Sequence, residues 1–282
     1  MTSFAIVTDS TADLPVDIQQ ERQIYIAPLH VLWGTDDFED GVDITRDQFF
    51  DRLATDPELP TTSQPTPAAF VELYKKAIAE TGAEGVLVLT ISAHLSGTYA
   101  SAIQAGGMVD FPVEVVDLRT VSIPTGLGVL KMADARDEGA SLEEAVALAR
   151  TLPDQLKLVF ALDTMKYLHK GGRIGGGKRL LGAALNIKPI LHIEDGKIDA
   201  YDSVRTRKRV SKRLIEILAD HIDENKSIHI AILHSRVPEE AEKLKATIEA
   251  RWTVERMVVT EVGSVIGVHV GPGALGFALL QY

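Results

Sequence analysis

The chain has 282 residues, of which 45% are hydrophobic and 24% charged, with no cysteine and a net charge of −11. This composition is typical of a globular protein with a sizeable core, and the negative charge argues against a general nucleic-acid binder. The lack of cysteine excludes a disulfide scaffold, a thiol nucleophile and any cysteine-ligated metal.

Targeting and metal-binding signals are also missing from the sequence. The start "MTSFAIVTDSTADLP" has no basic region followed by an apolar one, so we expect no signal peptide. No stretch approaches the ~18 apolar residues of a membrane helix, and a cytoplasmic protein is expected. His229 and His234 lie five apart on one expected strand and so face opposite sides, which argues against a metal site.

In the first half, expected strands alternate with expected helices. The strands are "FAIVTDS", "QIYIAPLHVLW", "GVLVLTIS" and "VEVVDL", and the helices are "ITRDQFFDRLA", "PAAFVELYKKAIAETG", "GTYASAIQAGGM" and residues 125–138 and 141–152. Ser141 and Glu144 form a capping-box pattern for the last helix. This alternation predicts βαβ units and a mainly parallel sheet, and the stretch 59–70, "LPTTSQPTPAAF", is expected to connect two helices.

The second half has a different pattern. It reads as the strand "LKLVFALDT", a hairpin turning at Glu194-Asp195-Gly196, a basic helix, the strand "SIHIAILHS", the helix "PEEAEKLKATIEARW" and a strand-rich tail. We therefore predict an α/β protein with a boundary near Pro153. Residues 1–153 would form an N-terminal domain whose mainly parallel sheet is flanked by helices. Residues 154–282 would form a C-terminal α+β domain.

Basic residues are concentrated in one part of this acidic chain. The window 166–213 holds 13 Lys and Arg but only 4 Asp and Glu, so it carries +9 while the remaining residues carry −20. Such a basic island is typical either of a surface for an anionic ligand or an acidic partner, or of a solvated helix face. Both interpretations stay open from the charges alone.

Two glycine-rich stretches match nucleotide-binding patterns only in part. "GRIGGGKR" fits Gly-x4-Gly-Lys, but Arg179 follows where a phosphate loop needs Ser or Thr. "GPGALG", from Gly271 to Gly276, lies six residues from the end of the chain, which leaves no room for a crossover helix. Neither is expected to bind a nucleotide.

Hydroxyl side chains are unusually dense before two of the expected helices. Thr61, Thr62, Ser63 and Thr66 precede one helix, and Ser96 lies at the start of another. Capping needs about one hydroxyl per helix, so the first group exceeds the structural requirement. Helix N-termini attract anions, and the excess donors favour a small oxyanion such as a carboxylate or phosphate.

A serine hydrolase is the alternative for the same residues. Ser96 lies between a strand and a helix, and His269 could act as its base. The Gly-x-Ser-x-Gly elbow is absent, however, because Ala93-His94-Leu95 precedes Ser96. Ser96 as a helix cap and His269 as a buried core residue explain the same positions without catalysis.

Taken together, six segments resemble the motifs of the DegV family in their usual order. They are "VTDSTADLP", "TTSQPTPAAF", "ISAHLSGTYASA", "LDTMKYLHKGGRI", "VRTRKR" and "VGSVIGVHVGPGALG", and they extend over nearly the whole chain. The resemblance implies a two-domain α/β protein that binds a long-chain fatty acid and has no other cofactor. It also implies a partner, a bacterial fatty acid kinase subunit that binds ATP, and a place in phospholipid metabolism.

The resemblance assigns roles to particular residues. Hydroxyls of Thr62, Ser63 and Ser96, with Thr61 adjacent and the late His269, would hold the carboxylate. Arg173 and Arg205, together with His269, would support transfer of the phosphoryl group by the kinase, and this chain alone would not be an enzyme. The basic island around the two arginines would face the kinase, and transient contact with a membrane surface is compatible with this role.

Overall fold

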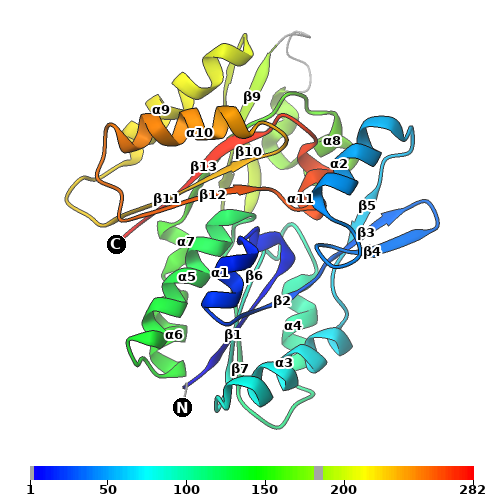
Figure 1. Cartoon of the computed structure of the whole chain (residues 1–282), viewed down its shortest axis with the longest axis vertical. Helices are drawn as coiled ribbons and strands as arrows, with labels where there is room; N and C mark the ends of the chain where they lie inside the picture. The colour runs from blue at the N-terminus through cyan, green and yellow to red at the C-terminus, as the bar shows by residue number, and fades with distance from the viewer. Residues whose placement is uncertain (1–2, 181–186) are drawn as a thin grey trace.

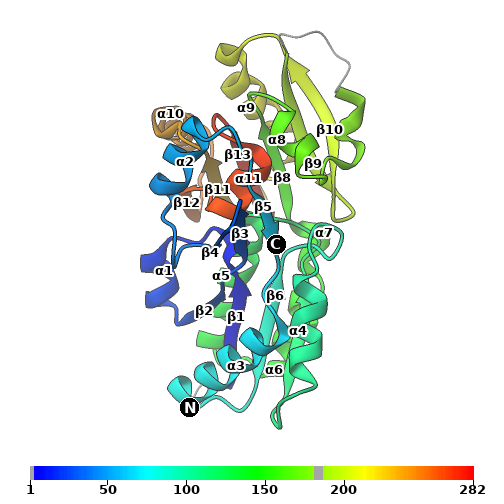
Figure 2. The same cartoon turned by 90° about the vertical axis from the view of Figure 1, so that its right-hand side faces the viewer.

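The computed structural model describes residues 3–180 and 187–282, which build two large β-sheets and one small sheet (Figure 1). The large sheets lie one above the other along the long axis of the molecule, with the sheet of the N-terminal half below (Figures 1 and 2). This arrangement confirms the predicted α/β class. None of the helices in the described ranges is both long and apolar enough to cross a bilayer.

The lower sheet is parallel throughout, as predicted, in the order β2-β1-β6-β7. Its central strands β1 and β6 are buried along their whole length, as expected for strands covered on both faces. Helices α3 and α4 pack against one face, and α5 and α6 against the other. These elements are β1 (Ala5–Asp9), β2 (Ile24–Ala27), α3 (Pro67–Thr81), β6 (Val86–Thr90), α4 (Thr98–Gly106), β7 (Val113–Asp117), α5 (Ile123–Asp137) and α6 (Leu142–Ala149).

Local signals in the sequence set the ends of these helices. Thr66 caps α3 through Ala69 N–H, Pro67 is its first residue, and Gly82 ends it in the left-handed conformation at φ 66°. The predicted capping box of Ser141 and Glu144 is present at α6. The short elements η1 (Ser10–Ala12), α1 (Val16–Glu21) and α7 (Leu152–Gln155) complete this half.

The upper sheet is mixed, in the order β10-β9-β8-β13-β11-β12, and only β11 and β12 are parallel. The predicted hairpin is β9–β10, and its turn lies between Glu194 and Lys197. Helices α9 and α10 bury their apolar residues on one face. The elements are β8 (Lys157–Ala161), α8 (Lys166–Lys170), η2 (Gly175–Leu180), β9 (Lys188–Glu194), β10 (Lys197–Val204), η3 (Arg207–Arg209), α9 (Val210–His221), β11 (Ile228–His234), α10 (Pro238–Glu249), β12 (Arg256–Glu261) and β13 (Leu275–Gln281).

A small antiparallel sheet corrects two expectations for the first half. The segment "QIYIAPLHVLW" is divided at Pro28 into β2 and a second strand, β3 (His30–Trp33), which belongs to a different sheet. The hydroxyl stretch is not only a connection, because Thr61–Ser63 form strand β5 against β3. Strand β4 (Asp36–Glu39) and helix α2 (Arg46–Thr55), which follows a Thr45–Gln48 capping box, complete this unit.

The tail corrects a third expectation, because "SVIGVHV" is a helix, α11 (Ser264–Val270), between β12 and β13. Its Val and Ile residues favour a strand, so the sequence predicted one. Gly263, which precedes the helix, has no side chain to cap it, and carboxylates from the other half accept hydrogen bonds from the N–H groups of Gly263 and Ser264. Long-range contacts therefore override the local preference.

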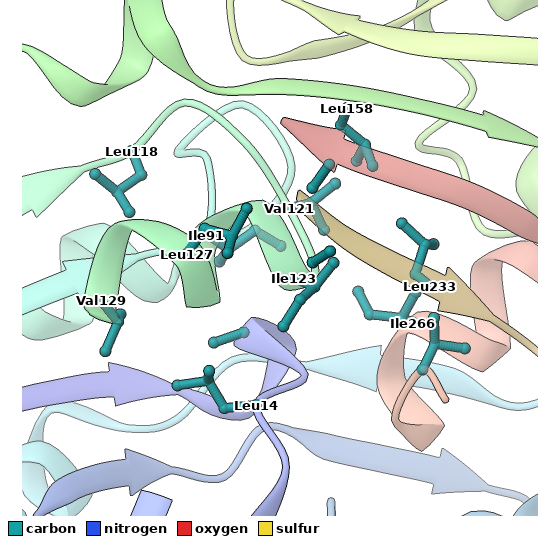
Figure 3. Close-up of a cluster of buried hydrophobic side chains, with 14 of the residues drawn as sticks. Leu14, Ile91, Leu118, Val121, Ile123, Leu127, Val129, Leu158, Leu233 and Ile266 are labelled. Carbon is teal, nitrogen blue, oxygen red and sulfur yellow. The ribbon is translucent and has the colours of Figure 1, made fainter. Parts of the chain in front are cut away.

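One apolar core joins the two halves. The α5 side of the lower sheet and the inner face of the upper sheet contribute to the same buried cluster (Figure 3). Helix α5 contacts strands of both large sheets, namely β1 and β6 below and β11 and β13 above. The predicted domain boundary at Pro153 falls within α7, and the division into 1–153 and 154–282 remains a prediction.

Candidate functional site

A cavity of about 710 Å³, including its open mouth, lies where the two halves meet at α11. Most of its wall is apolar and comes from strands of the upper sheet, from loops that follow strands of the lower sheet, and from α11. The apolar lining residues are Leu29, Ile91, Leu95, Val121, Leu158, Phe160, Leu168, Ile198, Leu233, Val265, Ile266 and Val270.

The polar part of the wall gathers most of the residues that the sequence singled out. Thr62 and Ser63 come from β5, Ser96 from the loop before α4, Arg173 from the loop after α8, and His269 from α11. Residues separated by as many as 207 positions therefore meet at one cavity. The strands and helices that carry them belong to both halves of the chain.

His269 contacts both β5 and the loop after α8 in this polar region. Its Nε2 is 3.0 Å from the hydroxyl oxygen of Thr62. Burial, with a smaller effect of the nearby Arg173 charge, lowers the pKa of His269 from 6.5 to about 4, so the imidazole is neutral near pH 7. A Cβ at Gly171 would lie 2.1 Å from Nδ1, so only glycine permits this packing.

Arg173 bridges two loops at the mouth of the cavity. Its Nε donates to the carbonyl oxygen of Leu95 at 3.1 Å, and its Nη1 donates to that of Gly171 at 2.9 Å. The side chain is exposed, and within the described ranges it forms no ion pair with a carboxylate. Its positive charge is therefore available to an anion at the mouth.

Ser96 is not arranged as the nucleophile of a hydrolase. Its hydroxyl is 2.9 Å from that of Thr98 and accepts a long hydrogen bond of 3.4 Å from Thr98 N–H. The imidazole of His269 bonds to Thr62 instead, and its Nδ1 has no partner in the described parts of the chain that could orient it. A serine hydrolase requires a base on the serine and a group that orients that base.

Buried carboxylates fix the start of α11, and thereby the position of His269. Asp13 accepts hydrogen bonds from Gly263 N–H at 2.7 Å and from the Ser122 hydroxyl, and Asp40 accepts one from Ser264 N–H at 2.9 Å. Burial raises the pKa of Asp13 to about 7 and also raises that of Asp40, although Arg46 opposes both shifts. Asp13 thus connects the two halves of the chain behind the cavity.

Two residues that the sequence associated with the site lie outside this lining. Thr61 is exposed and pairs with Leu32 at the first position of β5. Arg205 is exposed between β10 and η3. Their roles remain predictions, and the structure does not bring either side chain to the cavity wall.

Sequence reasoning missed two polar lining residues, Gln64 and Ser122. Gln64 directly follows the hydroxyls of β5 and was present in the quoted motif "TTSQPT", so its position was the available signal. Ser122 has a left-handed backbone, φ 66°, which is strained for a residue other than glycine. No feature of its sequence neighbourhood indicates that conformation.

Comparison with known proteins identifies the family. Residues 3–281 match the family model described as "Uncharacterised protein, DegV family". The chain belongs to the DegV family. A DegV domain-containing protein of Streptomyces coelicolor is 38% identical, over 96% of each chain.

Solved structures of DegV proteins have the same fold. A DegV family protein from Thermus thermophilus, whose structure is described by its fatty acid binding, aligns with a TM-score of 0.93 and 33% identity over 99% of this chain and 100% of that one. A protein from Eubacterium ventriosum, described as binding stearic acid, aligns with a TM-score of 0.91 and 27% identity over 99% and 98% of the two chains. These similarities confirm the family and the fold predicted from the sequence.

Proposed function

We propose that this chain binds a long-chain fatty acid, with the acyl chain inside the apolar cavity and the carboxylate at Thr62, Ser63 and Ser96. The observation that carries the proposal is a largely apolar cavity with hydroxyls, a neutral histidine and one arginine gathered at its polar part. The fatty acid binding described for related structures of the same fold supports it.

The apolar wall would supply most of the affinity. Burial of about 14 methylene groups at ~0.8 kcal/mol each gives roughly 11 kcal/mol before the costs of ordering and association are subtracted. Neutral hydroxyls at the head then orient the carboxylate without the desolvation cost of a buried ion pair. The lining therefore gives the two parts of the ligand different roles: the acyl chain supplies affinity and the head group fixes orientation.

His269 would set the direction of the hydrogen bonds at the head. A neutral imidazole has one N–H, and with that proton on Nε2 it donates to the Thr62 oxygen. The Thr62 hydroxyl can then donate its own proton to the carboxylate. Arg173, with Nε and Nη1 on backbone carbonyls, adds positive charge that favours the ionised acid.

We further propose that the bound carboxylate is presented to a separate ATP-dependent fatty acid kinase, which forms an acyl phosphate. Arg205 is exposed, lies outside the cavity wall and forms no ion pair in the ranges that the structure covers, which suits a residue that contacts a partner. Arg173, at the mouth, would stabilise the charge of the added phosphoryl group.

The test of the kinase role is reconstitution with the cognate kinase, ATP and oleate, with the acyl phosphate trapped as its hydroxamate. Arg205→Ala is expected to retain bound oleate but to lose product formation. Lys76→Ala is the matched control, because Lys76 is an exposed cation on α3, outside the basic island. Product formation by Arg205→Ala at the wild-type rate would contradict the role.

The hydrolase alternative predicts a different outcome. A fluorophosphonate probe would label Ser96 covalently if His269 activated it. We expect no labelling, because the structure pairs Ser96 with Thr98 and pairs His269 with Thr62.

A further inference from the structure

Gln64 occupies the mouth of the cavity without a partner of its own. It follows β5 directly and precedes the buried Pro65, so its backbone continues from the two hydroxyl residues Thr62 and Ser63. Its exposed side chain contributes to the same wall as Ser96. In the described parts of the chain, its amide group forms no hydrogen bond with another side chain or with the backbone.

Gly97 explains where the amide of Gln64 lies. A Cβ added at Gly97 would be 3.1 Å from both Cδ and Nε2 of Gln64 and 3.5 Å from Oε1. The flat amide group therefore packs against the Gly97 backbone, and a Cβ at that position would require the amide to shift by a few tenths of an ångström. Gln64 thus spans from β5 to the loop of Ser96, across the two groups of hydroxyls.

The other hydrogen-bond donors at the mouth do not by themselves satisfy a bound carboxylate. Arg173 uses Nε and Nη1 on the carbonyl oxygens of Leu95 and Gly171, and Ser96, whose hydroxyl contacts that of Thr98, has only one hydrogen to donate. A carboxylate offers about four lone-pair positions, and a primary amide offers two N–H donors. An amide on the same cavity wall as the hydroxyls, with its donors unused in the described parts of the chain, matches that demand.

We propose that Gln64 donates a hydrogen bond to the fatty acid carboxylate and selects the ionised head group. This inference rests on the proposed function of the cavity. Gly97 is the positioning residue, because its missing side chain allows the amide to lie over the Ser96 loop. Replacement of the donor by an acceptor of the same shape reverses the interaction, since two carboxylates then face each other.

The test compares Gln64→Glu, Gln64→Met and the control Gln104→Glu by the dissociation constant for oleate at pH 8. Gln104 is exposed on α4, so its variant introduces the same charge away from the mouth. We expect about a tenfold loss of affinity for Gln64→Met, about a hundredfold loss for Gln64→Glu, and no change for Gln104→Glu. At pH 5 the Gln64→Glu loss should shrink, because the two carboxyl groups then share a proton.

Gly97→Ala provides a second, independent measurement. The new methyl group shifts the amide, so Gly97→Ala should weaken oleate binding slightly in the wild type but cause no further loss in the Gln64→Met background. Equal oleate affinities for Gln64→Glu and Gln104→Glu, or additive losses for Gly97→Ala and Gln64→Met, would overturn the inference. Failure of the wild-type chain to bind oleate would instead overturn the proposed function itself.

Discussion

The two ends of the cavity are built from different chemistry. The inner end consists of aliphatic side chains such as Leu158, Leu233 and Ile91, which are 3%, 2% and 5% exposed. The mouth consists of Thr62, Ser63, Ser96, His269, Gln64 and Arg173, several of which are exposed or half-buried. On the proposed function, the inner end determines how strongly a ligand binds, and the mouth determines its orientation and chemical class.

The two ends also differ in how the fold holds them. The inner end belongs to the core that the two large sheets share (Figure 3). The mouth depends on single contacts between loops, such as Arg173 to Leu95 and Gln64 against Gly97. Substitutions at the inner end should therefore change chain-length preference, whereas those at the mouth should change head-group preference.

The largest effect is expected from Leu233→Trp at the inner end. The indole would occupy space that the end of the acyl chain needs, and exclusion of about four methylene groups at ~0.8 kcal/mol each corresponds to roughly 200-fold weaker binding. Dissociation constants for stearate and decanoate in the same variant would check this. Stearate should lose affinity and decanoate should keep it, and an equal loss for both acids would contradict the division between the two ends.

A smaller effect, on stability, is expected from Asp13→Asn behind the cavity. The pKa of Asp13 is about 7 in the folded chain and 3.8 when unfolded, so its contribution to the free energy of unfolding is full below pH 3.8 and is lost as the pH rises towards 7. Asparagine has no such loss. As the pH rises from 5 to 8, the free energy of unfolding of the variant should therefore increase relative to that of wild type by on the order of 2 kcal/mol, measured by urea unfolding.

His269 affects the pH dependence in the opposite direction. Its folded pKa of about 4 lies below 6.5, so the unfolded chain takes up the proton first and stability falls as the pH drops below 6.5. This contribution is present in wild type and in Asp13→Asn alike, and it cancels in their difference. If the difference in free energy of unfolding between wild type and Asp13→Asn stays constant from pH 5 to pH 8, Asp13 is not protonated in the folded chain over that range.

The smallest effect is expected from Thr62→Val at the mouth. The substitution keeps the shape of the side chain but removes the hydroxyl that contacts His269, so oleate affinity should fall about tenfold. Thr61→Val is the matched control, because Thr61 is the exposed neighbour on the same strand and is not part of the cavity wall. Equal losses of oleate affinity for the two variants would mean that Thr61 faces the cavity as much as Thr62 does, which would contradict the orientation of β5 described above.

The sequence predicted much of this arrangement because several signals are local. Thr66, Pro67 and Gly82 mark the ends of α3, and the alternation of elements predicts the parallel sheet. The excess of hydroxyls before α3 indicated an anion site, and Thr62 and Ser63 do lie at the cavity. These features depend on neighbours within a few residues, which a single sequence shows directly.

The remaining features depend on contacts over long distances in the chain. Helix α11 was mistaken for part of a strand-rich tail because its first N–H groups are bound by Asp13 and Asp40, more than 220 residues away. The strand at Thr61–Ser63 pairs with β3, about 30 residues earlier in the chain. The place of Gln64 depends on Gly97 of another loop, and no local pattern indicates that contact.

The most direct test of the central claim is native mass spectrometry of the chain purified from a bacterial host, followed by extraction and lipid analysis. The account predicts about one long-chain fatty acid per chain, and exchange with added oleate or palmitate. Thr62→Val and Gln64→Glu should each reduce the loaded fraction, whereas Thr61→Val should not. A wild-type chain that is isolated empty and binds neither acid would contradict the account.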